Sequence, residues 1–221
     1  MFPIGDDNTG RVLHPVVTPI LIGINVLVFF LELSGGERFI MNWAFIPARF
    51  AADPAGDMIT ILTAMFMHGG WLHLFGNMLF LWIFGDNVED RLGRGKYLIF
   101  YLLAGVAGTL AQFALMPNST VPNVGASGAI AGVLGAYILM FPQKRVDVLL
   151  GRAVVAMPAI IVIGAWVAFQ LIGGVGSFAA TDENAGGVAY MAHIGGFAAG
   201  FLMAFLLRGM LPPPRQPRIE A

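Results

Sequence analysis

Six long apolar stretches, separated by shorter polar ones, constrain the fold of this chain more than any other feature of its sequence. Only 11% of its 221 residues are charged, whereas soluble domains carry about 25% charged residues. Charges this sparse do not cover a water-exposed surface, so we predict a multi-span membrane protein. The six predicted spans are residues 16–33, 71–88, 97–115, 127–141, 154–172 and 188–207.

The positions of the cations predict how these spans are oriented. Lys and Arg concentrate in the cytoplasmic loops of membrane proteins. In a six-span topology only Arg38 and Arg49, both in the first loop, fall on the opposite side from the other Lys and Arg residues. We therefore predict an all-α bundle of six transmembrane helices over residues 16–208, with both termini in the cytoplasm. A polar segment, 1–15, precedes this domain, and a Pro-rich tail, 209–221, is expected to be disordered.

Composition also limits the chemistry open to the chain. The absence of cysteine excludes disulfides, thiol nucleophiles and thiolate metal sites. A net charge of −1 gives no indication of nucleic-acid binding. A metal site would have to use His68, His73 and His193, but the sequence lacks a His-Glu-x-x-His helix and a convincing carboxylate ligand. We therefore expect neither a metal nor another cofactor.

Four polar residues fall at a similar depth in this topology. The second, fourth and sixth spans all begin on the outer side. Their first turns carry His73 and Asn77, then Ser127, then His193. Polar groups inside a bilayer are unfavourable, and those that occur usually face the bundle interior or a wet cavity. Their convergence near the outer leaflet predicts a functional site there.

Two ladders of small residues predict which of these spans pack together. The sixth span has a small residue at 192, 196, 200 and 204, and the fourth has one at 128, 132 and 136. Faces of this kind let helix backbones approach closely in lipid. If the two faces pack against each other, His193 and Ser127 come within hydrogen-bond reach. The alternative is that the ladders serve helix packing alone.

Ser127 is a candidate nucleophile at the start of its span. Gly125 and Gly128 flank it with little side chain, and the unpaired N–H groups of a helix N-terminus favour an alkoxide or oxyanion. His193 is the candidate general base. No acidic residue lies in the membrane part of the fourth or sixth span, so we predict a Ser–His dyad rather than a triad.

Other polar residues within the spans have supporting roles in this interpretation. His73 and Asn77 lie four residues apart and share a helix face. Their side chains could either donate hydrogen bonds to an oxyanion or form a hydrogen-bonded pair between helices. For Asn25, Gln112 and Gln170 we predict packing hydrogen bonds rather than catalysis.

Two loops have distinctive compositions. Residues 42–50 of the first loop combine aromatic residues, Pro and Arg, which favours a segment lying in the membrane interface, with an ordinary loop as the alternative. The glycine-rich residues 173–187 lead into the sixth span and suit either a mobile cap or a flexible connection.

Three of these stretches resemble the sequence motifs of the rhomboid intramembrane serine proteases. Residues 125–128, Gly-Ala-Ser-Gly, resemble the family's Gly-x-Ser-x nucleophile motif. Residues 192–196, Ala-His-Ile-Gly-Gly, resemble its Ala-His-x-x-Gly base motif. Residues 73–77, His-Leu-Phe-Gly-Asn, with His68 upstream, resemble its oxyanion motif in the second span. The resemblance covers residues 15–208 and corresponds to the basic six-span bacterial form.

The resemblance implies a mechanism and a substrate class. It implies Ser127 as nucleophile and His193 as general base. The oxyanion hole would comprise His73, Asn77 and the Ser127 backbone N–H. The implied substrate is a transmembrane helix of another protein, cut near its outer end, in a bacterial inner or plasma membrane. Substrate entry in the family involves the second and fifth spans, where the corresponding gate positions are Phe80, Phe84, Trp166 and Phe169.

Two features depart from the family pattern. Some relatives carry an aromatic residue one turn after the serine that stacks on the base histidine, but here that position is Ala131. The sequence therefore does not indicate what orients the His193 ring. The first loop resembles the family's submerged hairpin but lacks an adjacent Trp-Arg pair.

Two other functions compete with proteolysis. A rhomboid-like pseudoprotease would bind membrane clients without cutting them, but such relatives typically lack the serine or the histidine. A small channel or transporter would need polar residues through the inner half, where the fourth and sixth spans are mainly Gly, Ala and aliphatic residues. We therefore predict an intramembrane serine endopeptidase whose partners are transmembrane substrates and the lipid bilayer. The sequence does not indicate an oligomeric state.

Overall fold

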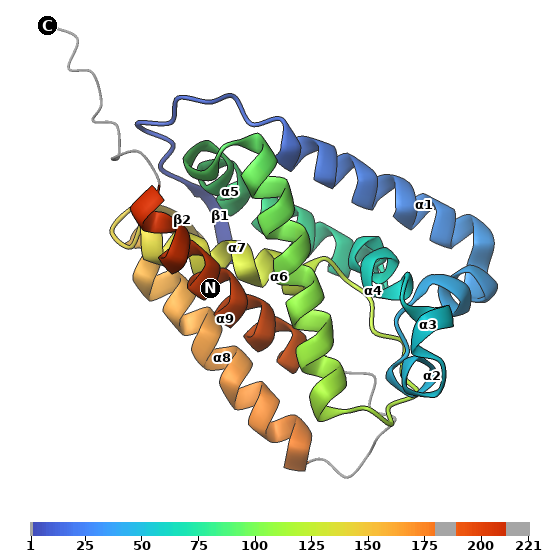
Figure 1. Ribbon diagram of the computed structural model, residues 1–221. Coiled ribbons are helices and arrows are strands. Elements are labelled where there is room, and N and C mark those ends of the chain that lie inside the picture. Colours follow the sequence, from blue (N-terminus) through green and yellow to red (C-terminus); the bar gives the residue numbers. More distant parts are fainter. Residues whose placement is uncertain (1, 180–188, 211–221) are drawn as a thin grey trace, which may run out of the picture.

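The computed structural model describes residues 2–179 and 189–210 as a helical bundle with a small sheet at one end (Figure 1). The long helices are α1 (Val17–Trp43), α5 (Trp71–Leu92), α6 (Arg94–Leu115), α7 (Ser127–Met140), α8 (Ala159–Ala179) and α9 (Tyr190–Leu207). The short helices are α2 (Pro47–Ala52), α3 (Pro54–Asp57), α4 (Thr60–Thr63), η1 (Ala64–Phe66) and η2 (Arg208–Met210). The strands are β1 (Phe2–Asp6), β2 (Arg145–Leu150) and β3 (Ala153–Pro158).

Four of the long helices, α1, α6, α8 and α9, are long and apolar enough to cross a membrane. Residues 54–66 and α5 pass the same test together, as a broken pair bent by 77°. Helix α7 has 14 residues, fewer than the roughly 20 that a span needs. The described residues therefore contain four candidate spans, or five with the bent pair, and a sixth span over α7 stays a prediction.

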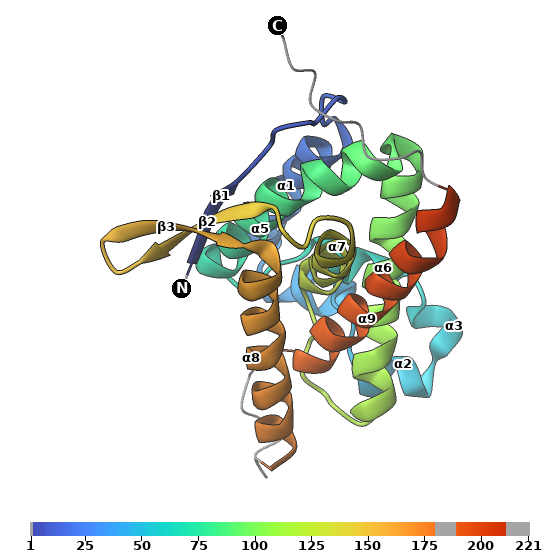
Figure 2. The same ribbon diagram turned by 90° about the vertical axis from the view of Figure 1, so that its left-hand side faces the viewer.

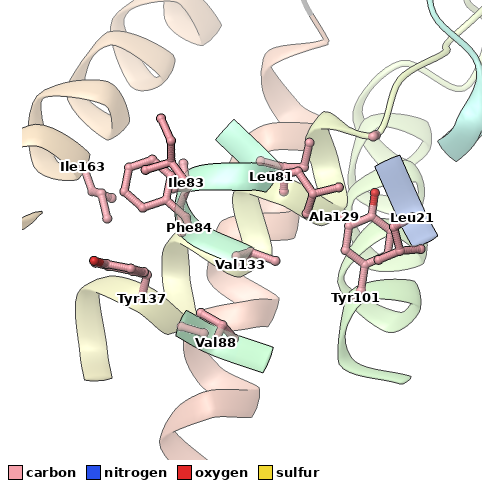
Figure 3. Packing of buried hydrophobic residues seen from close by; sticks show 14 of the residues in the cluster. Leu21, Leu81, Ile83, Phe84, Val88, Tyr101, Ala129, Val133, Tyr137 and Ile163 are labelled. Atoms are coloured by element: carbon pink, nitrogen blue, oxygen red, sulfur yellow. The ribbon is translucent and has the colours of Figure 1, made fainter. Parts of the chain in front are cut away.

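The short helix α7 occupies the centre of the bundle and is seen end-on in Figure 2. Its residues from Gly128 to Tyr137 are all buried. A helix that is apolar on every side needs a large core or a membrane around it, and here α5, α6, α8 and α9 contact it. Figure 3 shows part of this core, in which Phe84 of α5 lies edge-on to Tyr137 with 5.0 Å between ring centroids.

Small residues bring α7 and α9 into backbone contact. A Cβ added to Gly196 would collide with the carbonyl oxygen of Gly128, and one added to Gly200 would collide with that of Gly132. The prediction that the two ladders pack against each other is confirmed. This seam fixes the relative position of the first turns of α7 and α9, which carry Ser127 and His193.

The sequence predicts an exclusively helical chain, but three strands form an antiparallel sheet in the order β1-β2-β3. The predicted span 154–172 is therefore wrong at its start. Residues 153–158 pair with β2, with Arg145 opposite Pro158, and the helix begins only at Ala159. The turn between the strands contains Gly151 with a φ of 62°, which glycine adopts without strain. Figure 2 shows the resulting hairpin projecting from the bundle.

Helix α8 also extends further than predicted. It continues to Ala179, so the first glycines of stretch 173–187 are helical rather than part of a loop. These glycines accommodate α9, because a Cβ on Gly173 would collide with the Tyr190 ring. Residues 180–188, which contain the rest of the predicted connection, lie outside the described residues. The predicted disordered tail, 209–221, is wrong at its start, because residues 209–210 belong to η2; its remainder, 211–221, lies outside the described residues.

The start of α1 is capped by α5. The carboxylate of Glu89, which is fully buried, accepts hydrogen bonds at 2.8 Å from the backbone N–H groups of Val16, Val17 and Thr18. The first N–H groups of a helix have no partner within the helix. Glu89 therefore supplies the acceptors that α1 lacks.

The first loop folds into the short helices α2, α3, α4 and η1. Phe45 is fully buried, with its ring centroid 5.3 Å from that of Phe50 and 6.2 Å from that of Phe113 on α6. This aromatic cluster attaches the loop to the end of α6. The position of residues 42–50 in the membrane interface stays a prediction.

Candidate active site

Ser127 is the first residue of α7 and follows a turn that requires glycine. Gly125 has a φ of 138°, a conformation that L side chains rarely adopt. Its N–H donates to the carbonyl oxygen of Ala64 at 2.9 Å, which fixes the approach to the helix. The Ser127 hydroxyl therefore lies at a helix N-terminus, where backbone N–H groups point outward without intrahelical partners.

His193 lies in the first turn of α9, beside Ser127. Its Nε2 is 2.7 Å from Ser127 Oγ, although the two residues are 66 positions apart in the sequence. The proximity predicted from the small-residue ladders is confirmed. An unprotonated imidazole nitrogen at this distance is placed to take the proton of the hydroxyl.

Two residues of α8 hold the other side of the His193 ring. Gln170 Oε1 lies 2.8 Å from Nδ1. The Trp166 ring lies 5.8 Å from the imidazole between centroids, at an interplanar angle of 38°. The sequence interpretation assigned Gln170 to packing and missed this contact. The available indication was an amide in an apolar span, one turn after a tryptophan.

His73 lies beside the turn that precedes Ser127. A Cβ on Gly125 would be 3.0 Å from His73 Nε2 and 3.4 Å from Ser127 Oγ, so the two side chains flank the same glycine. His73 Nδ1 accepts a hydrogen bond from the Gly69 N–H at 3.3 Å. A neutral imidazole that accepts at Nδ1 carries its proton on Nε2. The His73 Nε2–H therefore lies beside the turn at Gly125.

Asn77 follows His73 by one helical turn and is 8% exposed. Among residues 2–179 and 189–210, its Nδ2 finds no hydrogen-bond acceptor. Buried amides are nearly always paired, so a free donor beside His73 is unusual. His68, which is buried, anchors the preceding turn: its backbone N–H donates to the Glu32 carboxylate at 3.1 Å.

The three histidines of the metal alternative do not form a ligand set. His68 and His73 lie with their rings 5.2 Å apart, but the ring nitrogens of His193 contact Ser127 and Gln170 instead. Over the part of the chain that the structure describes, no group of three or more His, Asp or Glu residues could hold a metal ion.

An apolar cavity of about 400 Å³ lies between α5, α7 and α8. Trp166 belongs both to its wall and to the surroundings of His193, so the cavity adjoins the Ser127–His193 pair. All four predicted gate positions line it. Its lining residues are Pro3, Phe80, Phe84, Leu134, Val162, Ile163, Ala165, Trp166 and Phe169.

The chain is similar to several known proteins. "Rhomboid protease GluP" of Bacillus subtilis is 34% identical over 197 residues, which cover 87% of this chain and 35% of that protein. "Rhomboid protein 1, mitochondrial" of Saccharomyces cerevisiae is 31% identical over 217 residues, which cover 91% of this chain and 56% of that protein. This chain thus spans about half, or less, of the length of these two relatives.

A third relative matches along nearly its full length. "Putative rhomboid protease YdcA" of Bacillus subtilis is 30% identical over 197 residues, which cover 88% of this chain and 89% of that protein. The family model described as the rhomboid domain matches residues 55–210, which include Ser127 and the two histidines near it, His73 and His193. The chain belongs to the rhomboid family.

Proposed function

We propose that the protein is an intramembrane serine endopeptidase that cleaves transmembrane helices of other membrane proteins. The observation that carries this proposal is the distance of 2.7 Å between Ser127 Oγ and His193 Nε2, at the N-terminal ends of two packed helices. Membership of the rhomboid family supports proteolysis, because two of the relatives are named proteases.

In the proposed reaction, His193 Nε2 takes the Ser127 hydroxyl proton as Oγ attacks the scissile carbonyl carbon. The carbonyl oxygen becomes an oxyanion, stabilised by the Ser127 backbone N–H and by side-chain donors of His73 and Asn77. The imidazolium then gives its proton to the leaving amine as the C–N bond breaks, which leaves an acyl ester on Ser127. A water molecule that gives its proton to His193 hydrolyses this ester and restores the serine.

We further propose the route by which substrate reaches the dyad. With six spans and both termini in the cytoplasm, the first turns of α7 and α9 open toward the outer side of the membrane. A substrate helix would enter between α5 and α8, past Phe80, Phe84, Trp166 and Phe169. The apolar lining of this cavity supports the route, because it matches the surface of a transmembrane helix.

Labelling of the purified protein with a fluorophosphonate probe tests the nucleophile without a known substrate. We expect the parent to be labelled, and both Ser127→Ala and His193→Ala to lose the label while they remain folded in detergent. A labelled Ser127→Ala variant would exclude this nucleophile.

An unlabelled parent would favour a pseudoprotease that binds membrane clients without cutting them. Cleavage of a glycine-containing transmembrane substrate in liposomes then separates that function from an active site that the probe does not reach. Cleavage lost in Ser127→Ala supports the protease, and binding without cleavage supports the pseudoprotease.

A further inference from the structure

A buried amide of α8 is directed at the base histidine. Gln170 is 5% exposed, and its Oε1 lies 2.8 Å from His193 Nδ1, the ring nitrogen remote from Ser127. The two ring nitrogens of His193 thus have different partners, a hydroxyl on α7 and an amide oxygen on α8. Each ring nitrogen of His193 therefore lies within hydrogen-bond distance of one side chain.

The identity of the atom facing Nδ1 determines which nitrogen can act as a base. A neutral imidazole carries one proton, on Nδ1 or on Nε2. An amide oxygen only accepts hydrogen bonds, so Gln170 Oε1 favours the proton on Nδ1. In that tautomer Nε2 has a free lone pair toward Ser127 Oγ. The other tautomer would set two lone pairs against each other across 2.8 Å and would leave no base beside the serine.

Helix α8 supplies this contact in an apolar setting. No charged residue occurs over Ala159–Ala179 or over Ser127–Met140, so neither helix offers a carboxylate to orient the ring. Gln170 and Trp166 lie four residues apart on one face of α8, and both meet the same imidazole. Gln170 is buried, and its replacement by an apolar side chain would leave Nδ1 facing a group that cannot form a hydrogen bond.

We infer that Gln170 is a positioning residue that holds His193 in the Nδ1–H tautomer and, with Trp166, fixes the orientation of its ring. The catalytic consequence rests on the proposed function, because it matters only if Ser127 is the nucleophile. The tautomer itself is a property of the resting protein and is measurable without any reaction.

Imidazole ¹⁵N NMR measures the tautomer directly. The chain has four histidines, so selective labelling gives few signals, and a His193→Ala variant assigns the signal of His193. We expect the Nδ1–H form in the parent and a shift toward the Nε2–H form in Gln170→Leu. A parent in the Nε2–H form, or a Gln170→Leu variant with an unchanged tautomer, would overturn the inference.

The fluorophosphonate labelling rate measures the consequence for the serine. Gln170→Leu replaces the hydrogen-bond acceptor by an apolar side chain of similar volume. We expect labelling of this variant to slow by about ten- to a hundredfold. Gln170→Glu keeps an acceptor oxygen, and we expect it to recover at least about tenfold over the leucine variant at pH 8. Failure of the glutamate variant to recover labelling would contradict a role through the hydrogen bond.

Asn25→Leu is a matched control, because it removes another buried amide, one that donates to the Leu21 carbonyl oxygen within α1 at 2.7 Å. We expect it to change the melting temperature but neither the His193 tautomer nor the labelling rate. Equal slowing in the Asn25 and Gln170 variants would indicate general loosening and would overturn the inference. Labelling of Ser127→Ala would overturn the proposed function instead, and the NMR result would still test Gln170.

Discussion

Helix α7 has a partly buried polar cluster at each end, and the two clusters are built in opposite ways. The Ser127 cluster, at its start, comprises Ser127, His193, Gln170, His73 and Asn77, none of which carries a permanent charge. The Tyr137 cluster, at its other end, comprises Tyr137, Asp6, Asn87 and Lys144, and joins the sheet to the bundle. Both clusters lie beside the same glycine-rich helix, so the presence of charges in one and their absence from the other is not explained by the helix itself.

The Tyr137 cluster is fully paired and contains charges. Asp6 Oδ2 accepts from the Tyr137 hydroxyl at 2.6 Å and from Asn87 Nδ2 at 2.8 Å. Lys144 Nζ donates to Asn87 Oδ1 at 2.5 Å. Such a network holds β1 against α5 and α7. Paired polar groups of this kind stabilise one arrangement of the chain.

The Ser127 cluster leaves donors unused. Asn77 Nδ2 has no acceptor among the described residues, and the Ser127 N–H lies at an uncapped helix N-terminus. Free donors are unfavourable in a folded protein unless a ligand or reaction intermediate uses them. The Tyr137 cluster therefore supports the fold, whereas the Ser127 cluster keeps hydrogen-bond donors that a reaction intermediate could use.

The largest effect is expected for the side-chain donors of the Ser127 cluster. His73→Ala and Asn77→Ala should each lower turnover by about 10²- to 10³-fold, because in the proposed mechanism each removes a hydrogen bond that forms only with the oxyanion. Steady-state cleavage in liposomes measures the effect, with melting temperature as the control for folding. Unchanged kinetics in both single variants and in the double variant would remove α5 from the mechanism.

A smaller loss is expected when the α7–α9 seam is widened. A Cβ at Gly196 would collide with the Gly128 carbonyl oxygen, so Gly196→Ala must move α9 and with it His193. A displacement of about 1 Å can lower a rate about a hundredfold. Gly23→Ala on α1 is the matched control, because a Cβ there meets nothing within 4 Å. Labelling that is equally fast in both variants would show that the seam does not position the dyad.

A substitution in the Tyr137 cluster should lower the unfolding free energy and leave the labelling rate of Ser127 unchanged. Tyr137→Phe removes the hydroxyl that donates to Asp6 but keeps the ring packed against Phe84. We expect the unfolding free energy to fall by about 1–3 kcal/mol, with the labelling rate of the folded protein unchanged. Thermal unfolding in detergent and fluorophosphonate labelling measure the two quantities. A slower labelling rate at unchanged stability would mean that the two ends of α7 are coupled.

The smallest effect is a pH dependence of stability. Burial is the largest influence on Asp6 and raises the pKa of its carboxyl to about 6, although the Tyr137 hydrogen bond lowers it. Between its ordinary pKa of about 4 and this value, the folded state holds a proton that the unfolded state has lost. The unfolding free energy therefore falls as the pH rises through this range. The melting temperature of Asp6→Asn should vary less between pH 4 and pH 7 than that of the parent, and equal slopes would contradict the assignment.

Much of the Ser127 cluster follows from local sequence. The glycines around Ser127, the spacing of His73 and Asn77, and the small-residue ladders each act within one turn or one helix face. Such short-range patterns can be recognised in the sequence, because helices that pack with their backbones in contact need a small residue at every fourth position of the contacting face. They predicted which helices meet, and the structure places the predicted serine and histidine side by side.

Tertiary structure alone decided the partner of His193 Nδ1, the strand at 153–158 and the role of the N-terminal segment. Helix α8 is apolar on nearly every face, and lipid is as apolar as a protein core, so apart from Gln170 its sequence gives little indication of which side faces inward. The rotation of α8 about its axis is set by its contacts with α7 and α9, and that rotation directs Gln170 at His193. Residues 153–158 are likewise apolar enough for a span, and only pairing with β2, itself paired with the distant β1, makes them a strand.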